Sequence, residues 1–138
     1  AFQGHAGVTQ CLCEANAIIN RAVEGATPLR AAAFQGHVAV VQALSGHAGP
    51  SQGPKSHDPI SLACAAFAGH ANTIRTLLSL GFDQDALVRD MPLILFASVL
   101  QGHAEVVRTL SDMGADRDGP DSEGNTPLHW AAEHGHLE

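Results

Sequence analysis

Apolar residues recur along the chain with the spacing of helix faces. Val40, Val41 and Leu44 form one set at i, i+1, i+4, and the same spacing returns at residues 106–110. Another apolar face comes before each set, in which small side chains follow a leucine by three and four residues, as at residues 29–33. The pattern therefore predicts pairs of short helices that repeat along the chain.

A glycine–histidine pair marks the turn between the two helices of each pair. The intervals between successive pairs are 32 or 33 residues. A fixed period of this length indicates a stacked array, because each unit can bury its apolar face only against its neighbours. The five pairs are Gly4-His5, Gly36-His37, Gly69-His70, Gly102-His103 and Gly135-His136.

The residues around these pairs carry a family resemblance. The segment 124–138 reads G-N-T-P-L-H-W-A-A-E-H-G-H-L-E, and the segment 26–37 reads A-T-P-L-R-A-A-A-F-Q-G-H. Both resemble the ankyrin repeat, which has a 33-residue period and a T-P-L-H-x-A signature. The copies at 60–70 and 93–103 have lost the T-P signature but keep leucine and small residues in phase.

The resemblance covers the whole chain and implies an all-α fold. We expect an ankyrin-repeat solenoid of stacked helix–turn–helix units with connecting β-hairpin-like loops. Residues 1–138 would form a single domain, with a partial repeat at 1–20, repeats at about 21–53, 54–86 and 87–119, and a partial repeat at 120–138. The apolar or incomplete end repeats favour a segment of a longer protein, because terminal repeats usually carry polar caps.

Threonine, proline and glycine predict where the helices begin and end. Thr27-Pro28 and Thr126-Pro127 suit the N-cap and first turn of a helix, and the glycine of each pair suits a turn with positive φ. The segment 46–58 predicts an irregular loop, or an adapted contact loop for a partner. In the connector before the fourth unit, apolar residues 86–88 and 91 either pack beneath a hairpin or face a partner.

One row of side chains is predicted to point out of the stack. Leucine seven residues before each pair's glycine, and small residues four and three before it, share the packed face, whereas positions two and five before the glycine lie 140° to 200° away. The resemblance implies that this outward face lines a concave groove where partners dock. The alternative is that the phenylalanines pack on one another as an extension of the core. The candidate partner-binding residues are Phe2, Gln3, Phe34, Gln35, Cys64, Phe67, Leu100, Gln101, Trp130 and Glu133.

Charge and composition limit the classes of partner. The formal net charge is −7, with 7 basic and 14 acidic residues, so nucleic acid is not an expected partner. The apolar run 91–100 is shorter than the roughly 20 residues that cross a bilayer, which predicts no membrane insertion. Three cysteines without disulfide or metal spacing favour a reducing, intracellular location, in the cytoplasm or the nucleus.

No motif in the chain predicts catalysis. The sequence contains neither a nucleophile elbow nor a phosphate-binding or dinucleotide-binding glycine pattern. Cys64 is better explained as a packing residue than as a nucleophile. The five turn histidines are expected to bond backbone groups of their own turn or of its neighbour, and no metal or cofactor is predicted. Asn20 resembles a target of the asparaginyl hydroxylase that modifies ankyrin repeats, although Ile18 replaces the usual acidic residue.

These observations favour a protein-interaction module that performs no reaction. A rigid array would present preorganised side chains to another protein or peptide through its groove. Two alternatives remain open: the chain is the scaffold or substrate-docking part of a larger enzyme or channel, or it is a structural spacer.

Overall fold

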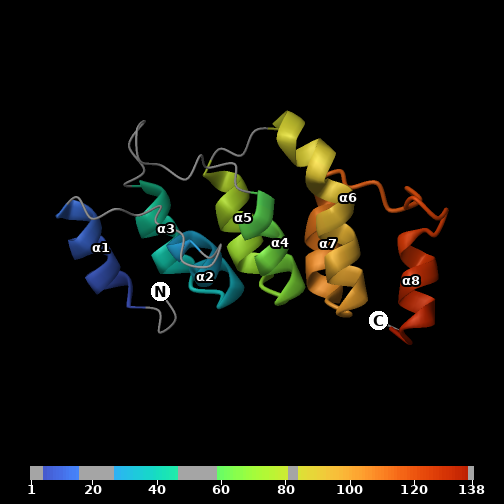
Figure 1. The fold of residues 1–138 in the computed structure, drawn as a ribbon, viewed down its shortest axis with the longest axis horizontal. Helices are drawn as coiled ribbons and strands as arrows, with labels where there is room; N and C mark the ends of the chain where they lie inside the picture. Colours follow the sequence, from blue (N-terminus) through green and yellow to red (C-terminus); the bar gives the residue numbers. More distant parts are fainter. Residues whose placement is uncertain (1–4, 16–26, 47–58, 81–83, 137–138) are drawn as a thin grey trace.

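The computed structural model describes residues 5–15, 27–46, 59–80 and 84–136. Helices form within all four ranges, and they follow one another in a single stack (Figure 1). They are α1 (Ala6–Glu14), α2 (Pro28–Phe34), α3 (Val38–Gly46), α4 (Pro59–Phe67), α5 (Ala71–Ser79), α6 (Gln84–Leu100), α7 (Ala104–Asp112) and α8 (Pro127–Glu133). The described residues contain no strand, so the predicted all-α class is confirmed.

The helices form two rows. An inner row runs through α2, α4, α6 and α8, and an outer row runs through α1, α3, α5 and α7, each helix packing on the next one of its own row. Within a pair, such as α4 and α5, the two helices also pack on each other. The core lies between the rows and consists mainly of Ala, Val, Leu and Ile side chains. Each helical pair therefore buries its apolar face against the next pair, as the 33-residue period predicts.

The helix starts follow the expected capping chemistry. Thr27 precedes α2, where its Oγ1 accepts a hydrogen bond from the backbone N–H of Arg30 at 3.2 Å, and Pro28 is the first helical residue. At α8, the Thr126 backbone N–H donates to Nδ1 of His129 at 3.2 Å, and Pro127 again begins the helix. Both Thr-Pro predictions are confirmed.

The glycine–histidine turns lock neighbouring repeats together. The glycine adopts φ of +73° to +82° at Gly36, Gly69 and Gly102, and the imidazole of the next repeat's histidine lies directly on it. Nε2 of His103 is 2.9 Å from the carbonyl oxygen of Phe67, and Nε2 of His136 is 3.1 Å from that of Leu100. Each of these two histidines thus bonds the backbone of the repeat before it, which is one of the two roles predicted for it.

The segment before the fourth unit belongs to helix α6, so the prediction of a connector there is wrong. α6 has 17 residues and includes the apolar positions at 86–88 and Met91, which is buried. In Figure 1, α6 extends beyond the neighbouring helices at the top of the stack. The segment 84–91 has no glycine that would end a helix and no Thr-Pro that would begin a new one, and Pro92 lies inside α6. The irregular loop predicted at 46–58 falls, from residue 47 on, outside the described residues.

The connector between α7 and α8 is held by short-range hydrogen bonds. Gly114 has φ of +93°, and Gly124 has φ of +87°. The backbone N–H of Asp121 donates to the carbonyl oxygen of Asn125 at 2.9 Å, which closes a hairpin-like turn without a β-ladder. This turn places Asp121 beside α8.

At α8 the packed face differs from the prediction. Leu128 and Ala132 occupy the positions that are buried in the other inner helices, yet both are exposed. The reason is that α8 packs on α6, while the described residues provide no outer helix behind it.

Candidate partner-binding surface

The phenylalanines of the inner row point out of the stack. Phe34 is 44% exposed and Phe67 is 47% exposed, whereas Leu29 and Leu62 on the same two helices are buried. α2 and α4 pack side by side, so the two rings occupy equivalent places on adjacent helices. The direction derived from helical geometry therefore holds at these two positions, and the rings are not sealed between layers.

Two further apolar side chains extend this surface and were not predicted. Ile60 is 49% exposed and Leu93 is 69% exposed. Each lies seven residues, about two helical turns, before Phe67 or Leu100, and so faces the same direction. Both stand where the better-preserved repeats have the capping threonine. The seven-residue spacing between large apolar residues is the signal in the sequence that could have identified Ile60 and Leu93.

We call the set Phe34, Ile60, Phe67, Leu93 and Leu100 the apolar ridge. Its members come from α2, α4 and α6, which are consecutive in the inner row. Leu100 is half-buried, and its carbonyl oxygen receives the bond to His136. Exposed apolar side chains gathered on one face are typical of an interaction site.

Polar residues accompany the ridge. Gln35 and Gln101 are exposed, each directly after a ridge residue in the chain. Cys64 is half-buried on α4 between Ile60 and Phe67. Phe2, Gln3 and Asn20 lie outside the described residues, so the structure does not place these three candidates.

Trp130, although predicted to belong to the same surface, makes its polar contacts within its own repeat. It is half-buried, and its indole Nε1–H donates to Oδ2 of Asp121 at 2.8 Å. Its ring is tilted against that of His134, with centroids 5.8 Å apart. The indole N–H is thus already bonded to a residue of its own repeat. Glu133, three residues further along α8, is exposed.

Asp121 organises the hairpin-like turn through both carboxylate oxygens. Oδ1 accepts from the backbone N–H groups of Glu123 and Asn125, each at 2.9 Å, and Oδ2 accepts from Trp130. Desolvation by itself would raise the pKa of Asp121, but the hydrogen bonds from Asn125, Trp130 and Glu123 outweigh it and lower the pKa below its ordinary value. The ionised carboxylate therefore holds the turn against α8.

Two of the cysteines differ in environment. Cys13 is buried on α1, and burial, together with the charge of Glu14, raises the pKa of its thiol. Cys11 is exposed on the same helix. Among the residues that the structure describes, no group of three His, Cys, Asp or Glu side chains is arranged to hold a metal ion.

A cavity of about 650 Å³ lies at the C-terminal end of the stack, between α6, α7 and α8. None of the predicted partner-binding residues lines it. The ridge and this cavity are therefore separate surfaces.

No helix in the described part of the chain has both the length and the apolar character to cross a membrane.

Comparison with protein families identifies the repeats. A model described as "Ankyrin repeats (3 copies)" matches residues 60–138, and one described as "Ankyrin repeat" matches residues 24–52. The first covers more than half of the chain and includes the two copies that have lost the Thr-Pro signature. No curated protein matches the chain.

Proposed function

Because the chain belongs to the ankyrin repeat family, we propose that it binds a partner protein through the apolar ridge and performs no reaction itself. Ankyrin repeats are in general modules for protein–protein interaction. The single observation that supports the ridge as the binding surface is the exposure of Phe34 and Phe67 at equivalent positions of adjacent inner helices. The rings would anchor the partner, since aromatic side chains, phenylalanine among them, are enriched in protein interfaces.

The chemistry of the ridge favours an apolar partner segment with neutral polar groups. The ridge itself contains no charged side chain, and the residues next to it in the chain, Gln35 and Gln101, are neutral. An amide can both donate and accept hydrogen bonds, so the glutamines suit the backbone of an extended peptide. Binding of this kind depends little on salt, because screening acts on charges.

The stack suits this role because it is preorganised. The histidine bridges to the backbone at Phe67 and Leu100 fix each repeat against the one before it. The two carbonyl groups belong to ridge residues, so the bridges hold the ridge backbone directly. A partner then pays little entropy for ordering the receptor.

The test is capture of a partner by the 138-residue protein and by the variant Phe34→Glu/Phe67→Glu. Both side chains are exposed, so the variant should fold, which far-ultraviolet circular dichroism checks. We expect the captured partner to bind the variant about 100-fold more weakly or worse, since two anchors worth well over 1 kcal/mol each are lost. Met113→Glu, an exposed apolar side chain at the end of α7, is the matched control and should bind like the unaltered protein.

Equal binding by the ridge variant and the control would reject the ridge as the docking surface. Loss of binding in both would show that added negative charge, and not the ridge, is responsible. A spacer role predicts that no partner is retained by any of the three proteins.

A further inference from the structure

The first row of the apolar ridge continues onto α8 as a charged residue. The residues two positions before the turn glycines are, in order along the stack, Phe34, Phe67, Leu100 and Glu133. α8 packs on α6 as α6 packs on α4, so Glu133 takes the next place in this row. It is exposed, as are the two phenylalanines. The row therefore presents three apolar side chains followed by one carboxylate.

This carboxylate gives the surface a defined charge pattern. The surface comprises the positions two, five and nine residues before the turn glycines of the inner helices. Among the residues that the structure describes at these positions, Glu133 is the single charged one. Charge complementarity therefore favours a partner segment that is apolar along α2, α4 and α6 and carries one cation at the end that lies on α8.

The second row of the ridge sets the width that a partner can fill. Ile60 and Leu93 form this row, and each precedes a residue of the first row by seven residues, or about 10.5 Å along its helix. Packed carbon atoms lie about 3.5–4.0 Å apart, so about 6–7 Å remains between the two rows. An extended chain fits this width, since paired extended chains lie about 4.7–4.9 Å apart. A helix does not fit it, because a helix with its side chains is about 10–12 Å across.

Small side chains lie between the two rows. Ala31, Cys64 and Ala97 each stand three residues before a residue of the first row, and all three are half-buried. The backbone of an extended partner can therefore approach α2, α4 and α6 closely, while the larger ridge side chains flank it.

The spacing of the inner helices selects the conformation of the extended chain. Packed helices lie about 8–10 Å apart, so equivalent positions of α2, α4 and α6 recur at about this interval. A β-strand returns a side chain to the same face every two residues, or about 6.6 Å. A polyproline II helix does so every three residues, or about 9.3 Å. Polyproline II thus places successive inward side chains on successive helices, whereas a β-strand does not.

We propose that the ridge binds a proline-rich segment in the polyproline II conformation. An apolar side chain at every third position contacts α2, α4 and α6 in turn, and a basic side chain one spacing further pairs with Glu133. This inference rests on the proposed function, because it names the kind of partner that the ridge takes. Polyproline II has no internal hydrogen bonds, so its carbonyl groups can accept from the side-chain amides of Gln35 and Gln101. Aromatic side chains commonly line grooves that bind such segments.

A designed peptide tests the proposal. It has an arginine at each end and three leucines between them, with two prolines separating each of these residues from the next. The two arginines serve either chain direction. The control peptide has the same composition, but its leucines stand at every second residue. Trp130, one helical turn before Glu133 and the single tryptophan of the chain, reports binding through its fluorescence. We expect the control peptide to bind about 10-fold more weakly or worse, since its leucines point in different directions.

Variants of the protein assign the contacts. Phe67→Glu should weaken binding of the first peptide about 10-fold or more, because it sets a charge against the leucines. Glu133→Gln should weaken it about 2–5-fold at low salt and leave it unchanged at high salt, since an exposed ion pair is weak and screened. Asp112→Asn removes the same charge from α7 and should have no effect.

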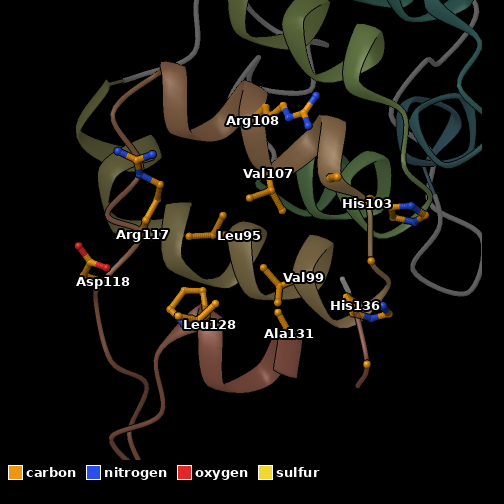
Figure 2. Close-up of a pocket in the computed structure, with 14 residues that line it drawn as sticks. Leu95, Val99, His103, Val107, Arg108, Arg117, Asp118, Leu128, Ala131 and His136 are labelled. Carbon is orange, nitrogen blue, oxygen red and sulfur yellow. The ribbon is translucent and has the colours of Figure 1, made fainter. Parts of the chain in front are cut away.

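Leu128→Gln is the control for binding at another apolar surface. Figure 2 shows Leu128 with Leu95 and Val99 around the cavity between α6, α7 and α8, which the ridge residues do not line. Leu128 is 77% exposed, so the change should not disturb folding, and the peptide should bind this variant like the unaltered protein.

Three results would overturn the proposal: equal affinity for the two peptides, no binding at about 1 mM peptide, or binding that Leu128→Gln weakens and Phe67→Glu does not. An unchanged affinity in Glu133→Gln at low salt would reject the pairing with a basic residue. A captured partner that requires Phe34 and Phe67, together with a peptide that does not bind, would leave the ridge as the docking surface and reject polyproline II as its ligand. Failure of this inference and failure of the proposed function can thus be told apart.

Discussion

The imidazole of His136 lies directly against Gly102, 34 residues earlier in the chain. A Cβ added at Gly102 would come within 2.7 Å of Nδ1 of His136, closer than such atoms pack. Nε2 of the same ring reaches the carbonyl oxygen of Leu100. The glycine is thus needed for its positive φ and for the space that the next repeat's histidine fills, which explains why the two residues recur together.

Gly102→Ala should destabilise the protein more than Gly135→Ala. Both glycines have φ of +73°, so both changes incur the roughly 1–2 kcal/mol cost of a left-handed alanine. Only at Gly102 does a side chain occupy the space, since a Cβ on Gly135 meets nothing within 4 Å. We expect an additional loss of about 1–3 kcal/mol from overpacking, measured by urea unfolding.

His136→Ala in the Gly102→Ala background should recover this additional loss. The double-mutant cycle isolates the contact between the two residues from the backbone cost. Equal destabilisation by Gly102→Ala and Gly135→Ala would contradict the interlock between repeats.

Asp121→Asn should loosen the turn before α8. The amide would present its NH₂ group to the indole N–H of Trp130, setting two donors against each other. Because the folded-state pKa of Asp121 is lowered, its carboxylate stabilises the fold above its ordinary pKa and loses this effect as the pH falls through the lowered value. The melting temperature should therefore be reduced in the variant at pH 7, by an amount that shrinks in strong acid.

The fluorescence of Trp130, the single tryptophan of the chain, reports the local change. Asp112→Asn removes an exposed carboxylate at the end of α7 and is the matched control. A melting difference for Asp121→Asn that stays constant from pH 7 into strong acid would contradict the role of the ionised group.

Pro92→Ala should stabilise the protein. Pro92 lies inside α6, where proline is about 3 kcal/mol less favourable than alanine, offset by about 1 kcal/mol because proline also restricts the unfolded chain. The expected net gain is about 2 kcal/mol in thermal or urea unfolding. Pro59 is the first residue of α4, where proline is tolerated, so Pro59→Ala should bring no such gain. A similar gain from both changes would show that the gain does not come from the position of Pro92 inside α6.

Alkylation should distinguish the two cysteines of α1. Cys11 is exposed, whereas Cys13 is buried and its pKa is raised, which leaves less of the reactive thiolate at neutral pH. Iodoacetamide at pH 7 should therefore modify Cys11 first, as followed by peptide mass spectrometry. In urea the rates should converge. Equal rates in the folded protein would mean that α1 does not pack on α3 as described.

The period and the turn chemistry were sufficient to predict the stack. The Gly-His pairs, the Thr-Pro starts and the direction of Phe34 and Phe67 follow from local geometry, which the sequence contains directly. The early start of α6 at Gln84 was not predicted, because the fixed period places a connector at residues where the local sequence allows a helix. The exposure of Leu128 also could not be deduced from its own repeat, since burial depends on the helix that packs behind it.

The sequence predicts only part of the candidate surface, since Ile60 and Leu93 were not among the predicted residues. The loss of threonine at Ile60 and Leu93 was recognised as drift from the repeat signature. Its consequence, a large apolar side chain on the outward face, emerges only when positions two turns apart are compared. Trp130, by contrast, was predicted to face outward, and its bond to Asp121 could not be foreseen from spacing within α8.

Site-specific photo-crosslinking tests the central claim most directly. A photoreactive phenylalanine analogue at position 67, in the middle of the apolar ridge, should crosslink to the captured partner, whereas the same group at position 113 on α7 should not. Crosslinks that form from position 113 and not from position 67 would show that the partner binds elsewhere on the stack, and would contradict the account.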